Sequence, residues 1–127
     1  MALHNQLGKW GEDFAAQYLR EHGYEIISRD WRFGHRDIDI IARTPDNTTV
    51  VFVEVKTRTS DVVTRPDDAV DVKKVRNIGL AANAYVKQMS VADMLRFDII
   101  SIVGTPNGDA PQLEHVKDAF NPCLVYR

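Results

Sequence analysis

The sequence predicts an α/β fold in which helices flank a central mixed sheet, and three observations lead to this prediction. Short segments rich in β-branched residues have the pattern of strands, two longer segments have the apolar spacing of helices, and their order is α-β-β-β-α-β. Such an order packs helices against a sheet. Because no repeat, low-complexity tract or linker interrupts the 127 residues, residues 1–127 are expected to form a single domain.

The chain is predicted to begin with an amphipathic helix over residues 7–22. Gly23 follows at the position where a glycine commonly ends a helix. The apolar stripe of this helix consists of Leu7, Trp10, Phe14, Tyr18 and Leu19. A first strand is expected over residues 25–30, and a connector rich in cations and aromatic side chains over residues 31–36.

The next two strands are expected to form a hairpin. The segments 37–43 and 50–58 are short and apolar, and Pro45-Asp46-Asn47 provides a turn between them. The two segments are therefore predicted to pair antiparallel. A loop is expected over residues 59–66.

The last part of the chain is predicted to contain a helix and two strands. The helix covers residues 67–87, and Asp67 and Asp68 suit its N-terminus. A strand follows over residues 96–103, and residues 113–117 would add an edge strand. The link from the preceding strand through this helix would form a right-handed crossover between parallel strands.

Charged side chains interrupt both strands of the predicted hairpin. Successive side chains of a strand point to opposite faces, so Glu54, Lys56 and Arg58 share one face with Phe52. Asp39 becomes their neighbour if the two strands pair. The flanking residues are strongly apolar, which indicates a central position where charge is costly unless it is paired or bound to a metal. The alternative is a structural Glu54–Lys56 pair on a face that is partly open to water.

This combination of two acids and a lysine fits the hydrolysis of a phosphodiester. The reaction needs a hard cation that neutralises the phosphate and lowers the pKa of a bound water. Mg²⁺ and Mn²⁺ take oxygen ligands, so Asp39 and Glu54 would supply carboxylates and Val55 a backbone carbonyl. Lys56 would orient the attacking water or stabilise the negative charge that develops on the phosphate.

Charge, cysteine content and the length of apolar runs limit the classes of protein to which the chain can belong. The net charge is −2, so nucleic-acid binding would need a local basic patch. The single cysteine, Cys123, rules out an internal disulfide and fits a reducing compartment. No apolar run approaches the ~18 residues of a transmembrane helix, and residues 1–9 lack a signal core. A cytoplasmic protein without membrane association is therefore expected.

Cations flank the candidate acids on both sides along the chain. They are expected to hold DNA phosphates, because phosphate contacts carry most non-specific affinity. The predicted nucleic-acid-binding residues are Arg32, Arg36, Arg58, Lys73, Lys74 and Arg76. Trp31 and Phe33 could stack on an unpaired base, but such aromatic residues more often lie in a core or an interface. The basic residues of the second helix could equally form its solvated face.

Two further acids, Asp37 and Asp98, have structural readings, and three histidines receive no role. Asp37 shares a strand face with Asp39 and would either assist metal binding or act only as a strand-end charge. Asp98 follows Arg96-Phe97 at a strand start and is expected to be structural, in a pair with a cation. No metal-ligand spacing exists among His4, His22 and His115.

Several short motifs, spread over about residues 6–120, are specific when taken together. They are Gly8-x-x-Gly11-Glu12-x-x-Ala15 with Tyr18-Leu19, Asp37-Ile38-Asp39-Ile40-Ile41-Ala42, Phe52-Val53-Glu54-Val55-Lys56-Thr57-Arg58, Ala69-Val70 with Lys73, Arg96-Phe97-Asp98, and Glu114-His115 with Ala119-Phe120. On these motifs the chain resembles the YraN-type family of small bacterial proteins. That family lies in the PD-(D/E)XK superfamily of restriction-endonuclease-like nucleases and is similar to archaeal-type Holliday-junction resolvases.

The resemblance implies a restriction-endonuclease-like core with Asp39, Glu54 and Lys56 at its nuclease centre. It adds Glu12 of the first helix, which by pattern alone would be a solvated carboxylate. The implied function is a Mg²⁺- or Mn²⁺-dependent endonuclease acting on branched or flapped DNA. A resolvase-like activity favours a homodimer, because two cuts need two sites. The alternatives are a catalytically silent nucleic-acid-binding or adaptor module with this fold, and a structural domain that uses Trp31–Phe33 as an interface.

Overall fold

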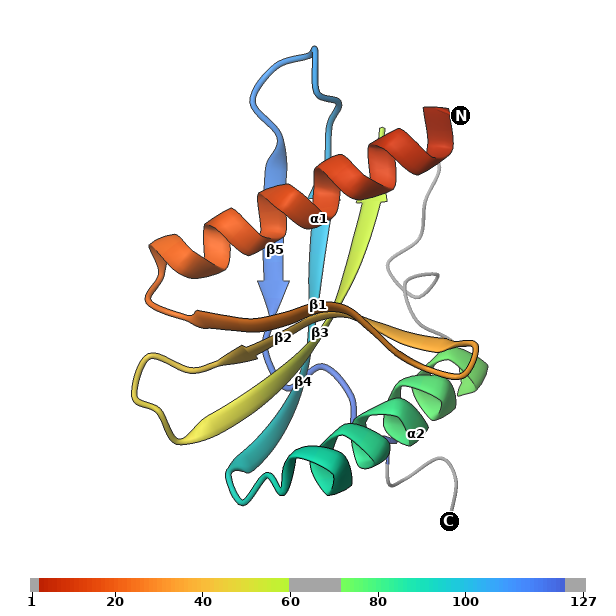
Figure 1. Cartoon of the computed structure of the whole chain (residues 1–127). Helices are drawn as coiled ribbons and strands as arrows, with labels where there is room; N and C mark the ends of the chain where they lie inside the picture. The colour runs from red at the N-terminus through yellow and green to blue at the C-terminus, as the bar shows by residue number, and fades with distance from the viewer. Residues whose placement is uncertain (1–2, 60–71, 123–127) are drawn as a thin grey trace.

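The computed structural model describes residues 3–59 and 72–122, which contain two helices and five strands (Figure 1). The elements are α1 (Leu3–Glu21), β1 (Glu25–Phe33), β2 (Arg36–Arg43), β3 (Thr49–Arg58), α2 (Val72–Met89), β4 (Met94–Val103) and β5 (Gln112–Val116). Their order confirms the predicted α/β fold. It is the α-β-β-β-α-β order of a restriction-endonuclease-like core, to which β5 adds an edge strand.

One mixed sheet lies between the two helices. Its strands follow the order β1-β2-β3-β4-β5, and only β3 and β4 pair in parallel. The hairpin of β2 and β3 and the parallel pair on either side of α2 were both predicted. Figure 1 shows α1 over one face of the sheet and α2 over the other.

Each helix covers its own layer of apolar side chains. Alternate residues of β3 enter the two layers, as the period of a strand requires. Val51 and Val53 pack in the layer that contains Leu19 of α1, whereas Phe52 packs in the layer that contains Tyr85 of α2. The central strand of the sheet is therefore buried on both faces, which explains why its sequence is an almost continuous apolar run.

A close approach of α1 to β3 fixes the position of the first helix. A Cβ atom on Gly11 would overlap the side chain of Thr57 on β3, so the contact requires glycine. Glu12 follows directly, and this contact therefore determines where Glu12 meets the sheet. Gly8 differs from Gly11, since a Cβ atom on Gly8 would meet no atom within 4 Å.

The predicted connector over residues 31–36 is wrong. β1 continues to Phe33 and β2 already begins at Arg36, so that only Gly34 and His35 turn the chain. Gly34 has φ 64, a value that glycine adopts without steric cost. The turn is thus two residues long and lies within the predicted connector, and both strands are longer than predicted.

Aromatic packing explains the extension of β1. Trp31 pairs with Ile38 across the hairpin, and its ring meets Tyr85 of α2 edge-on, with 5.3 Å between the ring centroids. Aromatic residues favour strands where they can pack on a neighbouring element. Trp31 is thus partly buried and packs against the core, whereas Phe33 near the hairpin turn remains 41% exposed.

The other boundaries shift by a few residues. α1 already begins at Leu3, and β4 begins at Met94. The predicted loop over residues 60–66 and the predicted helix start at Asp67 lie outside the described residues. Within the described ranges, neither helix combines the length and the apolar character that crossing a membrane requires.

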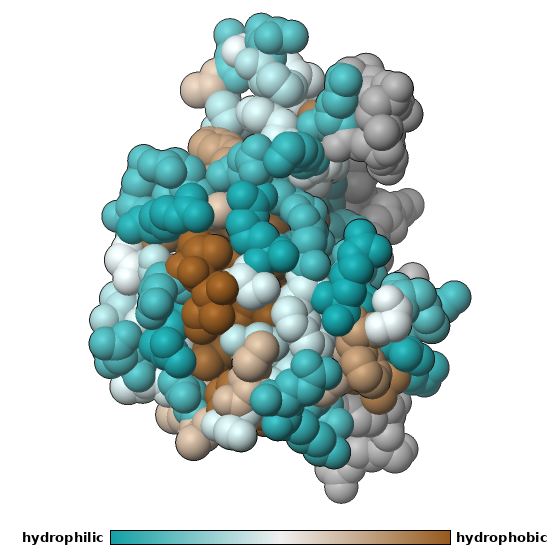
Figure 2. All heavy atoms as spheres, viewed as in Figure 1, coloured by the Kyte–Doolittle hydropathy of each residue, from teal (hydrophilic) through white to brown (hydrophobic). Residues whose placement is uncertain are grey.

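β1 is an edge strand with two irregularities. Its pairing with β2 shifts register between Ile26 and Ser28, and Asp30 has φ 51. Left-handed backbone is uncommon outside glycine, although aspartate is one of the residues that tolerate it. In the space-filling view an apolar strip runs downward from below α1 past the level of β1, on the left of an otherwise largely hydrophilic face (Figure 2).

Candidate active site

A cleft of about 710 Å³ lies where α1, the strands β1, β2 and β3, and α2 come together. Its walls carry charges of both signs. The charged residues are Lys9, Glu12, Arg29, Asp30, Arg32, Asp39, Glu54, Lys56 and Lys74. The four residues predicted to be catalytic are all among them, and Val55 also lines the cleft.

Asp39 enters the cleft at the point where β2 and β3 separate. The ladder between these strands ends at the pair of Ile40 and Val53. Beyond this pair, the backbone N–H of Val55 donates a hydrogen bond to Oδ2 of Asp39 at 2.8 Å. The side chain thus satisfies a backbone donor that the ladder no longer reaches. Oδ1 has no hydrogen-bond partner among residues 3–59 and 72–122 and remains available to a ligand.

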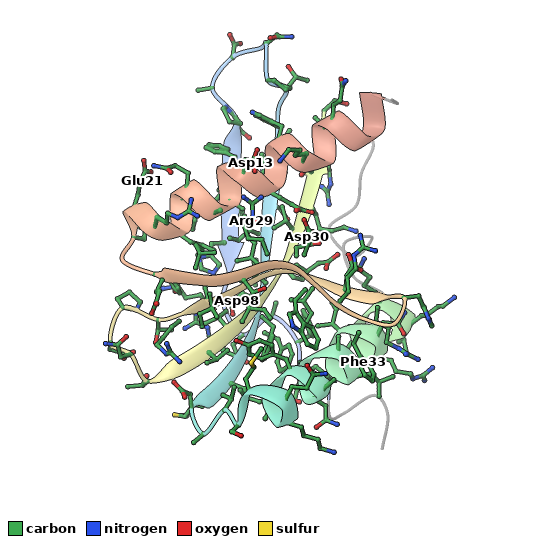
Figure 3. All side chains as sticks on the ribbon, viewed as in Figure 1. Asp13, Glu21, Arg29, Asp30, Phe33 and Asp98 are labelled. Carbon is green, nitrogen blue, oxygen red and sulfur yellow. The ribbon has the colours of Figure 1, made fainter. Side chains whose placement is uncertain are left out.

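Three carboxylates from three different elements meet in the cleft. Glu12 comes from α1, Asp30 from β1 and Asp39 from β2, and each offers an oxygen within 4.8 Å of the others. Figure 3 shows Asp30 on the side of β1 that faces α1. Asp30 was not predicted, because the sequence placed it at the end of a strand, where an aspartate is ordinary. Its left-handed backbone, which sequence patterns do not reveal, is what distinguishes it.

Burial and mutual repulsion shift the pKa values of two of these acids upward. Burial, the negative charge of Asp30 and a hydrogen bond with Asp30 raise the pKa of Glu12 to about 7. Burial and the charge of Glu54 raise the pKa of Asp39 to about 8, although the hydrogen bond from Val55 acts in the opposite direction. Both carboxyl groups therefore release their protons at a higher pH than free carboxyl groups do.

Glu54 has an ion-pair partner on α2. Its carboxylate is buried, with only 4% of the residue exposed, and Lys74 Nζ lies 3.1 Å from its Oε2. The alternative of a structural Glu54–Lys56 pair is therefore wrong. Lys56 lines the same cleft and is half-buried, and no ion pair or hydrogen bond of its ammonium group is found within the described part of the chain.

Arg29 borders the acid cluster on the α1 side (Figure 3). Its Nη2 donates a hydrogen bond to Asp13 at 2.8 Å and lies 4.0 Å from the carboxylate of Glu12. The Nε of Arg29 is buried and has no hydrogen-bond partner among the described residues. The guanidinium thus provides only partial compensation for the negative charges beside it.

The predicted nucleic-acid-binding residues fall into two groups. Arg32 and Lys74 line the cleft. The others lie outside its lining: Arg36 donates to Asn77 at 3.3 Å, Lys73 and Arg76 are exposed on α2, and Arg58 ends β3. Their contact with nucleic acid stays a prediction. Lys9 and Arg29, which the prediction did not include, also line the cleft.

The donor set of the cleft fits a hard divalent cation. Mg²⁺ and Mn²⁺ prefer oxygen ligands, and Glu12, Asp30 and Asp39 offer three carboxylate oxygens close together. Glu54 lies near enough for its charge to raise the pKa of Asp39. A cation bound among these groups would relieve their repulsion and displace their protons.

A second polar cluster lies away from the cleft. Asp98 is fully buried and accepts hydrogen bonds from Arg96 at 2.9 and 2.8 Å. Its Oδ2 also lies 2.7 Å from Nε2 of His115, whose Nδ1 lies 3.0 Å from the hydroxyl of Tyr18. Asp98 thus pairs with a cation as predicted. His115, which received no role, joins α1, β4 and β5 through this network.

A family model and the similar proteins of several bacteria all assign the chain to one protein family. The model of the uncharacterised protein family UPF0102 matches residues 11–102. A UPF0102 protein of Bacteroides thetaiotaomicron is 45% identical over 124 residues, which cover 98% of this chain and 99% of the relative. A UPF0102 protein of Geobacter metallireducens is 47% identical over 122 residues, covering 94% and 97%. One of Porphyromonas gingivalis is 41% identical over 127 residues, covering 100% and 92%.

Proposed function

The chain belongs to the uncharacterised protein family UPF0102, the YraN-type family that its motifs indicated. From this family and from the residues of the cleft, we propose that the protein is a divalent-metal-dependent endonuclease that hydrolyses DNA phosphodiester bonds. Branched or flapped DNA is the proposed substrate class. The observation that carries the proposal is the convergence of Glu12, Asp39, Glu54 and Lys56 on one cleft, although they come from α1, β2 and β3.

The acids of the cleft would hold the cation. Asp39 and Glu54 are the proposed ligands, with the carbonyl of Val55 as a further oxygen and Glu12 as an assisting carboxylate. Asp30 joins this set because its carboxylate lies with those of Glu12 and Asp39. A bound divalent cation supplies two things to the reaction, namely a lower pKa for its water and positive charge beside the phosphate.

Lys56 is the residue proposed to act on the water and the phosphate. Lys56 lines the cleft, and among residues 3–59 and 72–122 no carboxylate pairs with its ammonium group. It is therefore placed to hold the attacking water or the phosphate oxygens. Lys74 differs in this respect, because it already pairs with Glu54.

Cations around the cleft support a nucleic acid as the substrate. Lys9, Arg29 and Arg32 line it together with the two lysines, so a phosphate backbone would find positive charge beside the acids. Because the net charge of the whole chain is −2, affinity for DNA would have to come from this local group of cations. DNA as the substrate also fits the cytoplasmic location that the sequence predicts, and a resolvase-like activity on DNA would favour a homodimer.

Calorimetry and a cleavage assay test the proposal together. Wild-type protein is expected to bind Mg²⁺ or Mn²⁺, and Asp39→Asn/Glu54→Gln to lose this binding, whereas Asp109→Asn in the exposed β4–β5 loop retains it. Labelled four-way junctions, flaps and linear duplex then serve as substrates. Lys56→Ala is expected to lower cleavage by about 10²–10³-fold, and Lys87→Ala, an exposed lysine at the end of α2, to leave it unchanged. Equal cleavage by wild type and Lys56→Ala would overturn the role of Lys56.

A nucleic-acid-binding module without catalysis is the second candidate. The observation that favours it is the Glu54–Lys74 pair, which neutralises one of the proposed ligands within the chain. Salt-dependent mobility shifts with branched DNA, without metal binding and without cleavage in Mg²⁺ or Mn²⁺, would establish this candidate. The absence of any DNA affinity at low salt would exclude both candidates.

A further inference from the structure

Lys74 occupies a position that is unusual for a helix-surface lysine. Its ammonium group contacts a carboxylate that is almost completely buried, while 43% of its own side chain remains exposed. A buried carboxylate is costly unless a cation pairs with it. Glu54 therefore already has a counter-ion in the metal-free protein, and Lys74 on α2 provides it.

Among residues 3–59 and 72–122, the other acids of the cleft have no cation in such close contact; the guanidinium of Arg29 lies 4.0 Å from Glu12. Glu12, Asp30 and Asp39 lie within 4.8 Å of one another, and the pKa values of Glu12 and Asp39 rise instead. Within the described residues, the acid on the α2 side thus has an ammonium group in direct contact, whereas the acids near α1 face one another and the more distant guanidinium of Arg29.

Lys74 itself remains charged in this position. Burial alone lowers the pKa of its ammonium group, but the charge of Glu54, their hydrogen bond and the charge of Asp39 raise it overall. An ammonium group and a divalent cation at the same carboxylate repel each other, so the two are expected to exclude one another at Glu54.

We propose that Lys74 is a stand-in for the divalent cation at Glu54, and that it leaves this carboxylate when a metal ion binds between Asp39 and Glu54. This inference rests on the metal site of the proposed function and adds an exchange step to it. The exchange is feasible because the side chain of Lys74 is long, flexible and half exposed, so that its ammonium group can move into water. Lys74 would then be a positioning residue, which holds the Glu54 carboxylate in place before the metal arrives.

Lysine-selective NMR observes the exchange directly. Protein labelled with ¹⁵N at lysine Nζ is expected to show a hydrogen-bonded ammonium signal that Lys74→Met lacks and that Lys73→Met, a change of the exposed neighbour on the same helix, retains. Adding Mg²⁺ is expected to abolish or shift this signal in the wild-type protein. A signal that is unchanged while calorimetry shows Mg²⁺ bound overturns the inference and leaves the proposed function standing.

Metal affinity gives a second readout that does not depend on cleavage. Lys74→Met removes the competitor and is expected to tighten Mg²⁺ binding by about tenfold, whereas Lys73→Met is expected to have little effect. In the Glu54→Gln background, Lys74→Met should no longer change the affinity, because its effect acts through Glu54. An equal effect in both backgrounds would indicate a general charge effect and would overturn the inference.

The two proposals fail in different ways. If neither the wild type nor Lys74→Met binds Mg²⁺ or Mn²⁺, both the metal site and the exchange at Glu54 are refuted. If both proteins bind with the same affinity, the metal site is retained and only the role of Lys74 is refuted. Circular dichroism shows whether Lys74→Met still folds. If it does not, Lys74→Gln takes its place in both measurements, because glutamine keeps a polar group beside Glu54 but carries no charge.

Discussion

The backbone N–H of Val55 donates to the carboxylate of Asp39 across the gap that opens between β2 and β3. The contact joins the two strands one step beyond their last ladder pair. Asp39 therefore has two roles in the proposal, since one carboxylate oxygen holds the strands and the other is available for a cation. A substitution at Asp39 can separate these roles.

Asp39→Ala and Asp39→Asn are expected to differ in stability although both lose metal binding. Alanine leaves the Val55 N–H without an acceptor, which should lower the free energy of unfolding by about 1–2 kcal/mol. Asparagine retains an oxygen at this position and should remain close to the wild type. Denaturant unfolding without metal measures the difference. Equal stability of the two variants would contradict a structural role for this hydrogen bond.

The metal-free protein is expected to lose stability as the pH rises from about 5 to 9. The pKa values of Glu12 and Asp39 are about 7 and 8 in the folded state, whereas unfolded carboxyl groups titrate near 4. Between these values the folded state binds more protons, so the free energy of unfolding falls with rising pH. The melting temperature should be several degrees lower at pH 9 than at pH 6.

The double variant Glu12→Gln/Asp39→Asn is the control for this pH dependence. It lacks both titrating groups, and its melting temperature should change much less over the same range. Mg²⁺ should stabilise the wild type more at pH 8.5 than at pH 6, since the ion displaces protons at lower pH. A wild-type curve that rises with pH would show that these acids are not protonated in the folded state.

Two glycines of α1 are expected to respond in opposite directions to the same substitution. Gly8→Ala introduces a methyl group into open space within a helix and should stabilise the protein by about 0.5–1 kcal/mol. Gly11→Ala overlaps Thr57 and should cost about 1–3 kcal/mol. Thr57→Ala removes two of the three overlapping atoms and should restore part of the loss. Thermal unfolding measures all three, and a neutral Gly11→Ala would contradict the close approach of α1 to β3.

Asp98→Asn is expected to be among the most destabilising single substitutions of the chain. Burial alone raises the pKa of Asp98, but hydrogen bonds from His115, Arg96 and the Asp118 N–H lower it overall, so the group is ionised in the folded state. Removing its charge leaves Arg96 beside a neutral amide and should cost about 2–4 kcal/mol.

A surface ion pair provides the matched control for Asp98. Asp93 pairs with Arg43 at 3.3 Å in a partly exposed position, so Asp93→Asn should cost less than about 1 kcal/mol. The stability that Asp98 contributes should also be lost in acid, because its lowered pKa means that protonation opposes folding. The wild type and Asp98→Asn should therefore converge as the pH falls below about 4. Equal losses at Asp93 and Asp98 would contradict the buried network.

Much of the fold follows from local patterns. A short apolar run of β-branched residues locates β3, and the turn at Pro45-Asp46-Asn47 fixes its antiparallel pairing with β2. A helix between two buried strands requires a crossover, which predicts the parallel pair of β3 and β4. The face shared by Glu54 and Lys56 also follows from the period of a strand, and the cleft contains both side chains as predicted.

The missed features depend on contacts between distant segments. The end of β1 depends on the packing of Trp31 against Tyr85, which lies in another element. Lys74 is one of several lysines on a helix, and only the packing of α2 on the sheet brings it to Glu54. His115 and Asp98 lie 17 residues apart, and the pairing of β4 with β5 brings them together. Spacing in the sequence carries no information on such pairs.

The irregular backbone of β1 has a consequence for how the protein behaves in concentrated solution. An open sheet edge with an apolar strip is a template to which another extended chain can add as a further strand through backbone hydrogen bonds. The register shift after Ile26 and the left-handed Asp30 interrupt that template in two places, and Asp30 adds a charge there. We therefore expect Asp30, which gives the cleft an additional carboxylate, also to lower the tendency to aggregate, so that replacing Asp30 with an apolar β-branched residue would put solubility at risk together with the proposed metal site.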